Sequence, residues 1–219
     1  MIRDELIKKV ALKMDEISSS DDVIVAVYSG DNNPLYTQIN GLLNESVNDV
    51  LTKAPIYRLT SFVSVVPKDD IRADNVDGGR QVAVARVPSN FIRIVSITDT
   101  QFKRPIVELA YEGDEVDKRQ HNRFLMAGNA KPVAVFAYDV LGQGEKAITC
   151  YSYAAGATPS PAIHYIKRFE GDLDVSSDID IDDYLADIVT WVCAGKVFAS
   201  QGDITKGKTC DDNAVALMV

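Results

Sequence analysis

Histidine, cysteine and tryptophan are scarce in this chain, and their scarcity limits the chemistry that it can carry. The 219 residues include two histidines, three cysteines and one tryptophan. Cys150, Cys193 and Cys210 are odd in number, lie far apart and form no Cys-x-x-Cys pair. A disulfide framework is therefore not expected, and a reducing compartment is the simpler interpretation.

Catalytic and phosphate-binding motifs are also missing from the sequence. A Ser-His-Asp or Cys-His site would need His121 or His164, and no Gly-x-Ser-x-Gly motif accompanies either one. There is no Gly-x4-Gly-Lys-Ser/Thr loop, and Gly142-Gln143-Gly144 lacks the glycine that should follow it. We predict that the chain is not an enzyme and has no catalytic, cofactor-binding or metal-binding residues.

No run of eighteen apolar residues occurs, so we expect no membrane span. Residues 1–17 form an amphipathic stretch with acidic residues among the apolar ones, which is not typical of a secretory signal. The composition, 46% hydrophobic and 25% charged, is that of an ordinary globular protein.

The net charge is −9, because 32 acidic residues outnumber 23 basic ones. A protein that grips nucleic-acid phosphates needs a basic face, so this balance argues against a nucleic-acid reader. It is compatible with a surface along which DNA passes without sticking, since like charges repel.

Helical periodicity marks the N-terminal quarter of the chain. Apolar residues recur at spacings of three and four over residues 2–17 and again over 34–54. Asn33 is a suitable N-cap for the second helix, Pro34 fits its first position, and Pro55 ends it.

From Tyr57 onward the period changes to two, which predicts strands. A polar segment at 67–80 is expected to be an exposed loop, and a charged helix is expected at 114–124. Strands 91–97 and 106–111 should form one hairpin or meander. The predicted strands are 59–66, 81–86, 91–97, 106–111, 133–138, 147–153 and 162–169.

The C-terminal region returns to helix, at residues 183–201, with Asp182 or Asp183 as its cap. A polar break at 202–212 and an apolar tail at 214–219 are expected to follow. The order of elements predicts an α+β fold in which N-terminal and C-terminal helices form a bundle around a central, mostly antiparallel β-domain. The expected regions are 1–56, helical; 57–170, β-rich; and 171–219, a helix and tail that pack with 1–56.

An acidic run lies between the last strand and the last helix. It resembles a calcium loop, but a loop beginning at Asp178 would need glycine and glutamate where Asp183 and Val189 stand. A solvated loop that caps the helix is the better interpretation, with incidental divalent binding left open. The run consists of Asp172, Asp174, Asp178, Asp180, Asp182 and Asp183.

Two basic clusters have two possible interpretations. They are surface charges that keep the chain soluble, or they pair with acidic residues of a neighbouring copy. The first comprises Arg86, Arg93, Lys103 and Arg104; the second comprises Lys118, Arg119 and Arg123.

Several segments resemble the head–tail connector (adaptor or ring) proteins of short-tailed bacteriophages, especially those of crAss-like phages. The segments are Val87-Pro88-Ser89-Asn90-Phe91-Ile92-Arg93-Ile94, Lys103-Arg104-Pro105-Ile106, residues 117–123 and Lys131-Pro132-Val133. The helices at 34–54 and 183–201 occur in the same order, and Val87 with Ser89-Asn90 replaces the leucine and paired acids that are commoner there. The resemblance covers most of the chain.

The resemblance implies a structural virion protein, assembled in the bacterial cytoplasm, at the junction of head and tail. Identical subunits, usually twelve, would form a ring beneath the portal protein, contact the next tail ring or tail protein, and line a channel for double-stranded DNA. No cofactor or membrane is implied. We expect contacts through Arg93, Lys103, Arg104, Arg119 and Arg123, and through the tail residues Val215, Leu217 and Val219.

Two alternatives stay open at the level of sequence. One is a soluble enzyme with an unrecognised carboxylate site, drawn from residues 172–183. The other is a tail-completion or capsid-associated protein, which shares the composition but not the ring symmetry.

Overall fold

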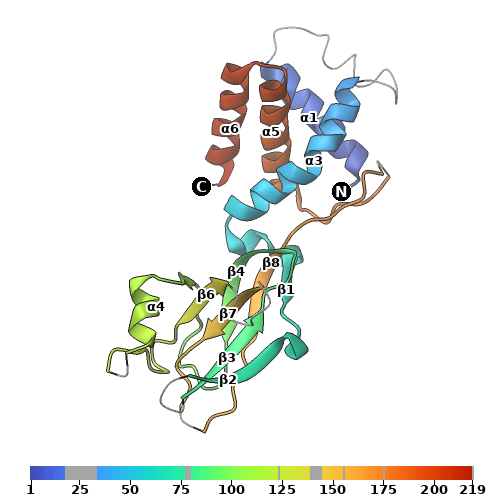
Figure 1. Ribbon diagram of the computed structural model, residues 1–219. Helices are drawn as coiled ribbons and strands as arrows, with labels where there is room; N and C mark the ends of the chain where they lie inside the picture. The colour runs from blue at the N-terminus through green and yellow to red at the C-terminus, as the bar shows by residue number, and fades with distance from the viewer. Residues whose placement is uncertain are drawn as a thin grey trace. The chain divides into compact units, whose positions relative to one another are not determined.

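The chain has an α+β fold that divides into two compact units (Figure 1). The computed structural model describes residues 1–17, 34–76, 80–122, 124–138, 145–154, 156–174 and 176–218. The helical unit comprises Met1–Phe62 and Arg168–Val219, and the β unit comprises Val63–Lys167. The predicted fold class, terminal helices with a central region of mostly antiparallel strands, is confirmed.

The helical unit is a bundle assembled from both ends of the chain. Its helices are α1 (Arg3–Ile17), α3 (Pro34–Lys53), α5 (Asp183–Ser200) and α6 (Ile204–Met218). Helix α5 packs against the other three, and eleven of its residues are buried, as its broad apolar stripe predicts. Asp182 caps it by accepting a hydrogen bond from the Leu185 amide at 2.7 Å. Among the described helices, none has the length and apolarity needed to span a membrane.

Helices α5 and α6 approach each other closely where two glycines meet. A Cβ at Gly195 would lie 3.2 Å from the Gly207 carbonyl oxygen, and a Cβ at Gly207 would lie 3.1 Å from that of Gly195. The connection between α5 and α6 is short. Gly202, with a φ of +85°, follows the end of α5, and Asp203 precedes α6 and accepts a hydrogen bond from the Lys206 amide at 3.1 Å. The helices therefore form a tight antiparallel pair.

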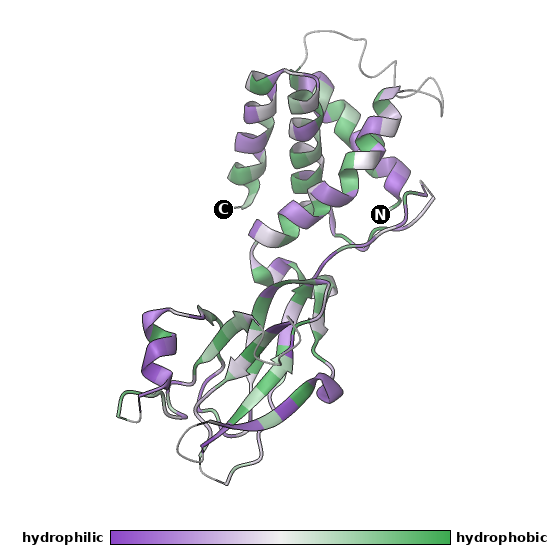
Figure 2. Ribbon diagram, in the orientation of Figure 1, coloured by the Kyte–Doolittle hydropathy of each residue, from purple (hydrophilic) through white to green (hydrophobic). Residues whose placement is uncertain are grey.

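The predicted polar break at 202–212 and the separate apolar tail are wrong, because residues 204–218 form the single helix α6. The residues that α6 buries are Gly207, Cys210 and Ala214, which are spaced by three and four but are small. A stripe of small residues lacks the large apolar side chains by which an amphipathic helix is recognised. Figure 2 shows that the hydrophobic turns of α6 lie next to the C-terminus.

Three asparagines of α3, spaced four residues apart, hold the backbone that follows the β unit. Asn48 donates to the Phe169 carbonyl at 3.0 Å and accepts from the Phe169 amide at 2.8 Å. Asn44 donates to the Gly171 carbonyl at 2.8 Å, and Asn40 donates to the Leu173 carbonyl at 3.0 Å. We call Asn40, Asn44 and Asn48 the asparagine ladder.

Arg3 of α1 fixes two members of the ladder from the other side. Its side chain is completely buried and donates to the side-chain oxygen of Asn40, to the Asn40 carbonyl at 2.7 Å, and to the side-chain oxygen of Asn44 at 2.7 Å. Burial lowers the pKa of the guanidinium. Because each amide oxygen faces Arg3, each amide nitrogen is turned toward the segment 169–173.

The β unit consists of two sheets that share one core. Strands β1 (Val63–Val65), β8 (Ala162–Lys167) and β4 (Phe91–Thr98) form the first sheet in that order. The second, in order, contains β2 (Ile71–Val76), β3 (Arg80–Arg86), β7 (Lys146–Cys150), β6 (Ala134–Tyr138) and β5 (Ala110–Tyr111). Only the β5–β6 pair is parallel among these strands. Their common core includes Ala83, Ile97, Ile148 and Ile163.

The chain enters and leaves the β unit at adjacent points. Val63 pairs with Ile166 across β1 and β8. On the helical unit, the rings of Phe62 and Phe169 lie edge to face with their centroids 6.3 Å apart. Along the chain, the β unit is therefore an insertion between Phe62 and Arg168 of the helical unit.

Four local predictions for the β region are wrong. The expected loop at 67–80 contains β2 and the 3₁₀ turn Lys68–Asp70, and β2 was missed because it is a polar edge strand. The strand expected at 59–66 begins only at Val63, after 3₁₀ turns at Ile56–Arg58 and Thr60–Phe62.

The expected hairpin of 91–97 with 106–111 is reduced to one bridge between Ile97 and Ile106, and β5 pairs with β6 instead. The charged helix is shorter than expected, because α4 spans only Glu115–Gln120. Figure 2 shows α4 as largely hydrophilic.

Replacing Asn44 by alanine should destabilise the helical unit by about 1–3 kcal/mol, because a buried Arg3 donor and the Gly171 carbonyl would both lose a partner. Urea unfolding followed by the fluorescence of Trp191, the only tryptophan and a residue of α5, reports on this unit. Asn213→Ala on α6 is the matched control for helix propensity. Equal urea midpoints for Asn44→Ala and Asn213→Ala would contradict a stabilising role of the asparagine ladder.

Candidate functional site

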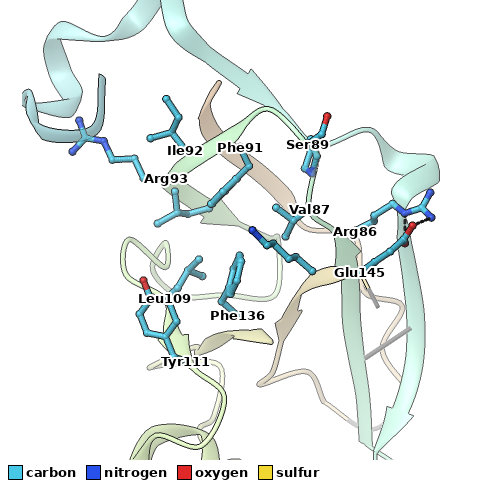
Figure 3. Close-up of a pocket in the computed structure, with 13 residues that line it drawn as sticks. Arg86, Val87, Ser89, Phe91, Ile92, Arg93, Leu109, Tyr111, Phe136 and Glu145 are labelled. Carbon is cyan, nitrogen blue, oxygen red and sulfur yellow. Dashed lines mark hydrogen bonds and ion pairs between the residues drawn. The ribbon is translucent and has the colours of Figure 1, made fainter. Parts of the chain in front are cut away.

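A recess of the β unit lies beside β4 and has a volume of about 650 Å³ (Figure 3). Residues from the end of β3, the turn before β4, β4 itself, β6 and the start of β7 line it. We call it the aromatic pocket. Its lining residues are Arg86, Val87, Pro88, Ser89, Phe91, Ile92, Arg93, Ile94, Leu109, Tyr111, Phe136, Glu145 and Lys146.

Stacked aromatic rings make the floor of this pocket. The ring centroid of Phe91 lies 5.6 Å from that of Tyr165, which is buried, and 6.2 Å from that of Phe136. Tyr111 meets Phe136 edge to face at 6.1 Å. A register shift between Phe91 and Arg93 interrupts the pairing of β4 with β8, and a bulge of this kind redirects side chains. Phe91 and Phe136 face the interior of the pocket from opposite sides (Figure 3).

Charged side chains lie at the margins of the pocket. Arg86 forms a two-pronged ion pair with Glu145, and this hydrogen bonding raises the pKa of the guanidinium. Arg93 lies on the opposite margin (Figure 3), is half-buried, and has a pKa lowered by that burial. Lys146 lies over the Tyr138 ring, 5.7 Å from its centroid. Three cations and one anion leave this margin positive on an acidic chain.

The structure separates the first predicted basic cluster into two parts. Arg86 and Arg93 line the aromatic pocket, whereas Lys103 and Arg104 do not. Lys103 and Arg104 are exposed in the connection between β4 and β5, where the Lys103 amide donates to the Asn129 carbonyl at 3.0 Å. The four residues therefore do not form one site.

The second predicted cluster lies on α4. Lys118 and Arg119 line a shallow recess of about 520 Å³ together with Glu115, Asn122 and Leu125. Arg119 pairs with Glu115 one helical turn away. Beside the recess, Phe124 is 93% exposed and Leu125 is 60% exposed. Arg123 lies outside the described residues.

Of the predicted C-terminal contact residues, Val215 and Leu217 belong to the last turns of α6. Leu217 lines a groove of about 440 Å³ with residues of α1, α5 and α6, including Glu16, Trp191 and Ala216. Its carbonyl accepts a hydrogen bond from the Tyr184 hydroxyl at 2.6 Å. Val215 is 55% exposed, and Val219 lies outside the described residues.

The acidic run is a structural loop in the part of the chain described. Asp174 accepts hydrogen bonds from the Ser176 amide and hydroxyl, which lower its pKa, and Asp182 caps α5. No group of three or more His, Cys, Asp or Glu side chains that could hold a metal ion occurs among the described residues. His121 lies 3.5 Å from Asp117 at the end of α4, and His164 lies in β8.

Sequence reasoning missed the aromatic floor, Lys146 and the asparagine ladder. Tyrosine and phenylalanine are numerous in the chain, and their spacing does not show which rings meet. The ladder had a readable signal, since Asn40, Asn44 and Asn48 recur at intervals of four on a predicted helix. The pairing of Arg86 with Ala147 across β3 and β7 brings Glu145 and Lys146 to the pocket, which local sequence does not reveal.

Comparison with known proteins provides no further assignment. No family model matches the chain, and no curated protein matches it.

The three cysteines should be unreactive in the native protein. All are buried, and desolvation raises the thiol pKa to about 12 for Cys150 and Cys193 and to about 11 for Cys210. Ellman's reagent at pH 8 is expected to titrate three thiols in denaturant and to react with the native protein only as fast as the chain opens. Rapid reaction of any one of them in the native protein would contradict their burial.

Proposed function

We propose that this protein is a structural component of a bacteriophage virion, a subunit of the connector ring that joins the portal to the tail. Its work is binding: contacts between copies build the ring, and other contacts attach the ring to the portal and to the next tail component. Double-stranded DNA passes through the lumen. The proposal rests on the resemblance carried by residues 87–94, 103–106, 117–123 and 131–133 and on the surfaces described above.

The observation that carries the proposal is a pair of chemically different apolar surfaces, one on each unit. The helical unit exposes Leu217 at a groove, and the β unit exposes Phe124 and Leu125 beside a recess lined by Lys118 and Arg119. Exposed apolar residues that lie beside recesses mark interaction surfaces. A closed ring needs two different surfaces on each subunit, because one face of each copy meets another face of the next.

The architecture of the helical unit supports the same function. Its bundle is closed by residues from both ends of the chain, and the β unit is a separate compact unit formed by the residues between them. The wall of a ring needs a rigid helical body. Contacts with a further component need a separate unit, whose surface can differ without a change in the wall. The acidic balance of the chain suits a channel that DNA must pass without being held.

Sedimentation of the purified protein with the portal protein of the same virus tests this function. We expect the protein to sediment with portal rings and to reach saturation at a fixed ratio of copies to portal subunits. A protein that stays in the supernatant at every concentration would contradict the proposal. Unrelated rings of similar mass serve as the control for trapping.

Charge reversal at Arg104 and Arg119 should weaken assembly, since both are exposed in the part of the β unit assigned to contacts. The double variant Arg104→Glu, Arg119→Glu is expected to lower the yield of rings or portal complexes by roughly tenfold, a loss of about 1.4 kcal/mol. Lys68→Glu with Lys167→Glu, the control, changes the net charge equally at exposed positions of the same unit. If both double variants give the same yield of rings and portal complexes, Arg104 and Arg119 make no contact in the assembly.

Substitution of Phe124 and Leu125 by serine should leave folding intact, because both side chains are exposed. We expect the variant to keep the wild-type urea midpoint and to lose affinity for the portal or for the next tail component. Binding of each component measured separately identifies which one uses this surface. Unchanged binding to both would remove the surface from the proposed interface.

A further inference from the structure

We infer that the aromatic pocket of one copy receives the segment Asp172–Leu173–Asp174 of a second copy. We call this segment the acidic ridge. The inference rests on the proposed assembly of identical subunits and names the two surfaces that meet. The ridge belongs to the helical unit and the pocket to the β unit, so the contact joins different faces of two copies.

The ridge has a fixed backbone and exposed side chains, of which the Asp174 carboxylate also accepts hydrogen bonds from Ser176. The asparagine ladder holds the carbonyls of Gly171 and Leu173, at 2.8 and 3.0 Å, from one side. Leu173 is nevertheless 55% exposed, and Asp172 and Asp174 are exposed on either side of it. A large apolar side chain held outward on an anchored backbone loses little conformational entropy on binding, so it is well prepared to enter a pocket.

Gly171, which precedes the ridge, allows the Phe169 ring to pack against the backbone of this segment. A Cβ at this position would lie 2.2 Å from the Phe169 ring, so a larger residue would force the ring or the backbone to move. The same ring makes the edge-to-face contact with Phe62. The segment is therefore packed and hydrogen-bonded along its length, while its leucine remains outside the core.

The pocket complements the ridge in both apolarity and charge. Its interior is formed by Phe91, Phe136 and Leu109 (Figure 3), which suits a leucine side chain. Arg93 and Lys146 belong to its lining, and Lys146 forms no ion pair with any described residue. An apolar centre with a cationic margin therefore faces an apolar centre flanked by two carboxylates.

A second copy of this chain is the occupant that fits best. Each copy carries one pocket and one ridge, so a head-to-tail contact repeats from copy to copy and can close into a ring. The positive margin is local on a chain of net charge −9, and charge of this kind directs a partner to one place rather than to the whole surface.

Disulfide trapping between two different variants tests the contact. Leu173→Cys and Ser89→Cys, the second an exposed residue of the pocket, are placed in separate chains of different length. The two variants are mixed and oxidised, with and without the portal, and are then separated by gel electrophoresis without reductant. We expect the disulfide-linked heterodimer to be the main product. The native cysteines are buried and should not contribute. Thr205→Cys and Thr98→Cys, also exposed, replace the two positions in the control mixture.

Charge variants add a second readout. Lys146→Glu should lower the yield of heterodimer by roughly fivefold, and Asp174→Lys in the ridge-bearing chain should restore it. A heterodimer yield no higher than that of the control mixture, with and without portal, would overturn the inference. A single chain that carries both Leu173→Cys and Ser89→Cys is a further test. A disulfide that forms within this chain, but never between two chains, would also overturn the inference.

The two proposals can fail separately. If the protein sediments with portal rings but gives no heterodimer, the connector function stands and the ridge contact is wrong. If the heterodimer forms but portal binding is absent, the contact between copies stands and the connector function is wrong.

Discussion

The helical unit depends on one buried cation held by neutral amides. Arg3 belongs to α1, the asparagine ladder belongs to α3, and the segment 169–173 follows the β unit in the sequence. Four residues of an α-helix advance about 6 Å, and two residues of an extended chain advance about 6.6 Å. Asparagines spaced by four can therefore meet alternate carbonyls, and Arg3 orients the amides of Asn40 and Asn44. This arrangement joins the two ends of the chain into one body.

The same arrangement explains how surface and core are divided. The ladder satisfies the backbone of a segment that belongs to no helix or strand, and this leaves the Leu173 side chain outside. In the β unit, the aromatic rings bridge core and surface, because Tyr165 is buried whereas Tyr111 is 62% exposed. The two proposed contact surfaces are therefore anchored on packed or hydrogen-bonded backbone, which would reduce the entropy lost on binding.

The sequence predicted the elements whose apolar stripes are made of large residues. Helices α1, α3 and α5 and strands β3, β4, β6 and β8 lie within a few residues of their predicted bounds. It failed where the buried stripe is small, as in α6, and where a strand is polar on an edge, as in β2. For the site, Arg86 and Arg93 were singled out as cations. Their meeting with Phe136 and Lys146 depends on strand pairing far along the chain, which no local pattern contains.

Electron cryomicroscopy of the purified protein mixed with its portal is the measurement that tests the connector function most directly. The account predicts a ring of density on one face of the portal, coaxial with its channel, in which the helical units form a continuous wall. Portal particles that stay bare at saturating protein, or density that binds without rotational order, would contradict it.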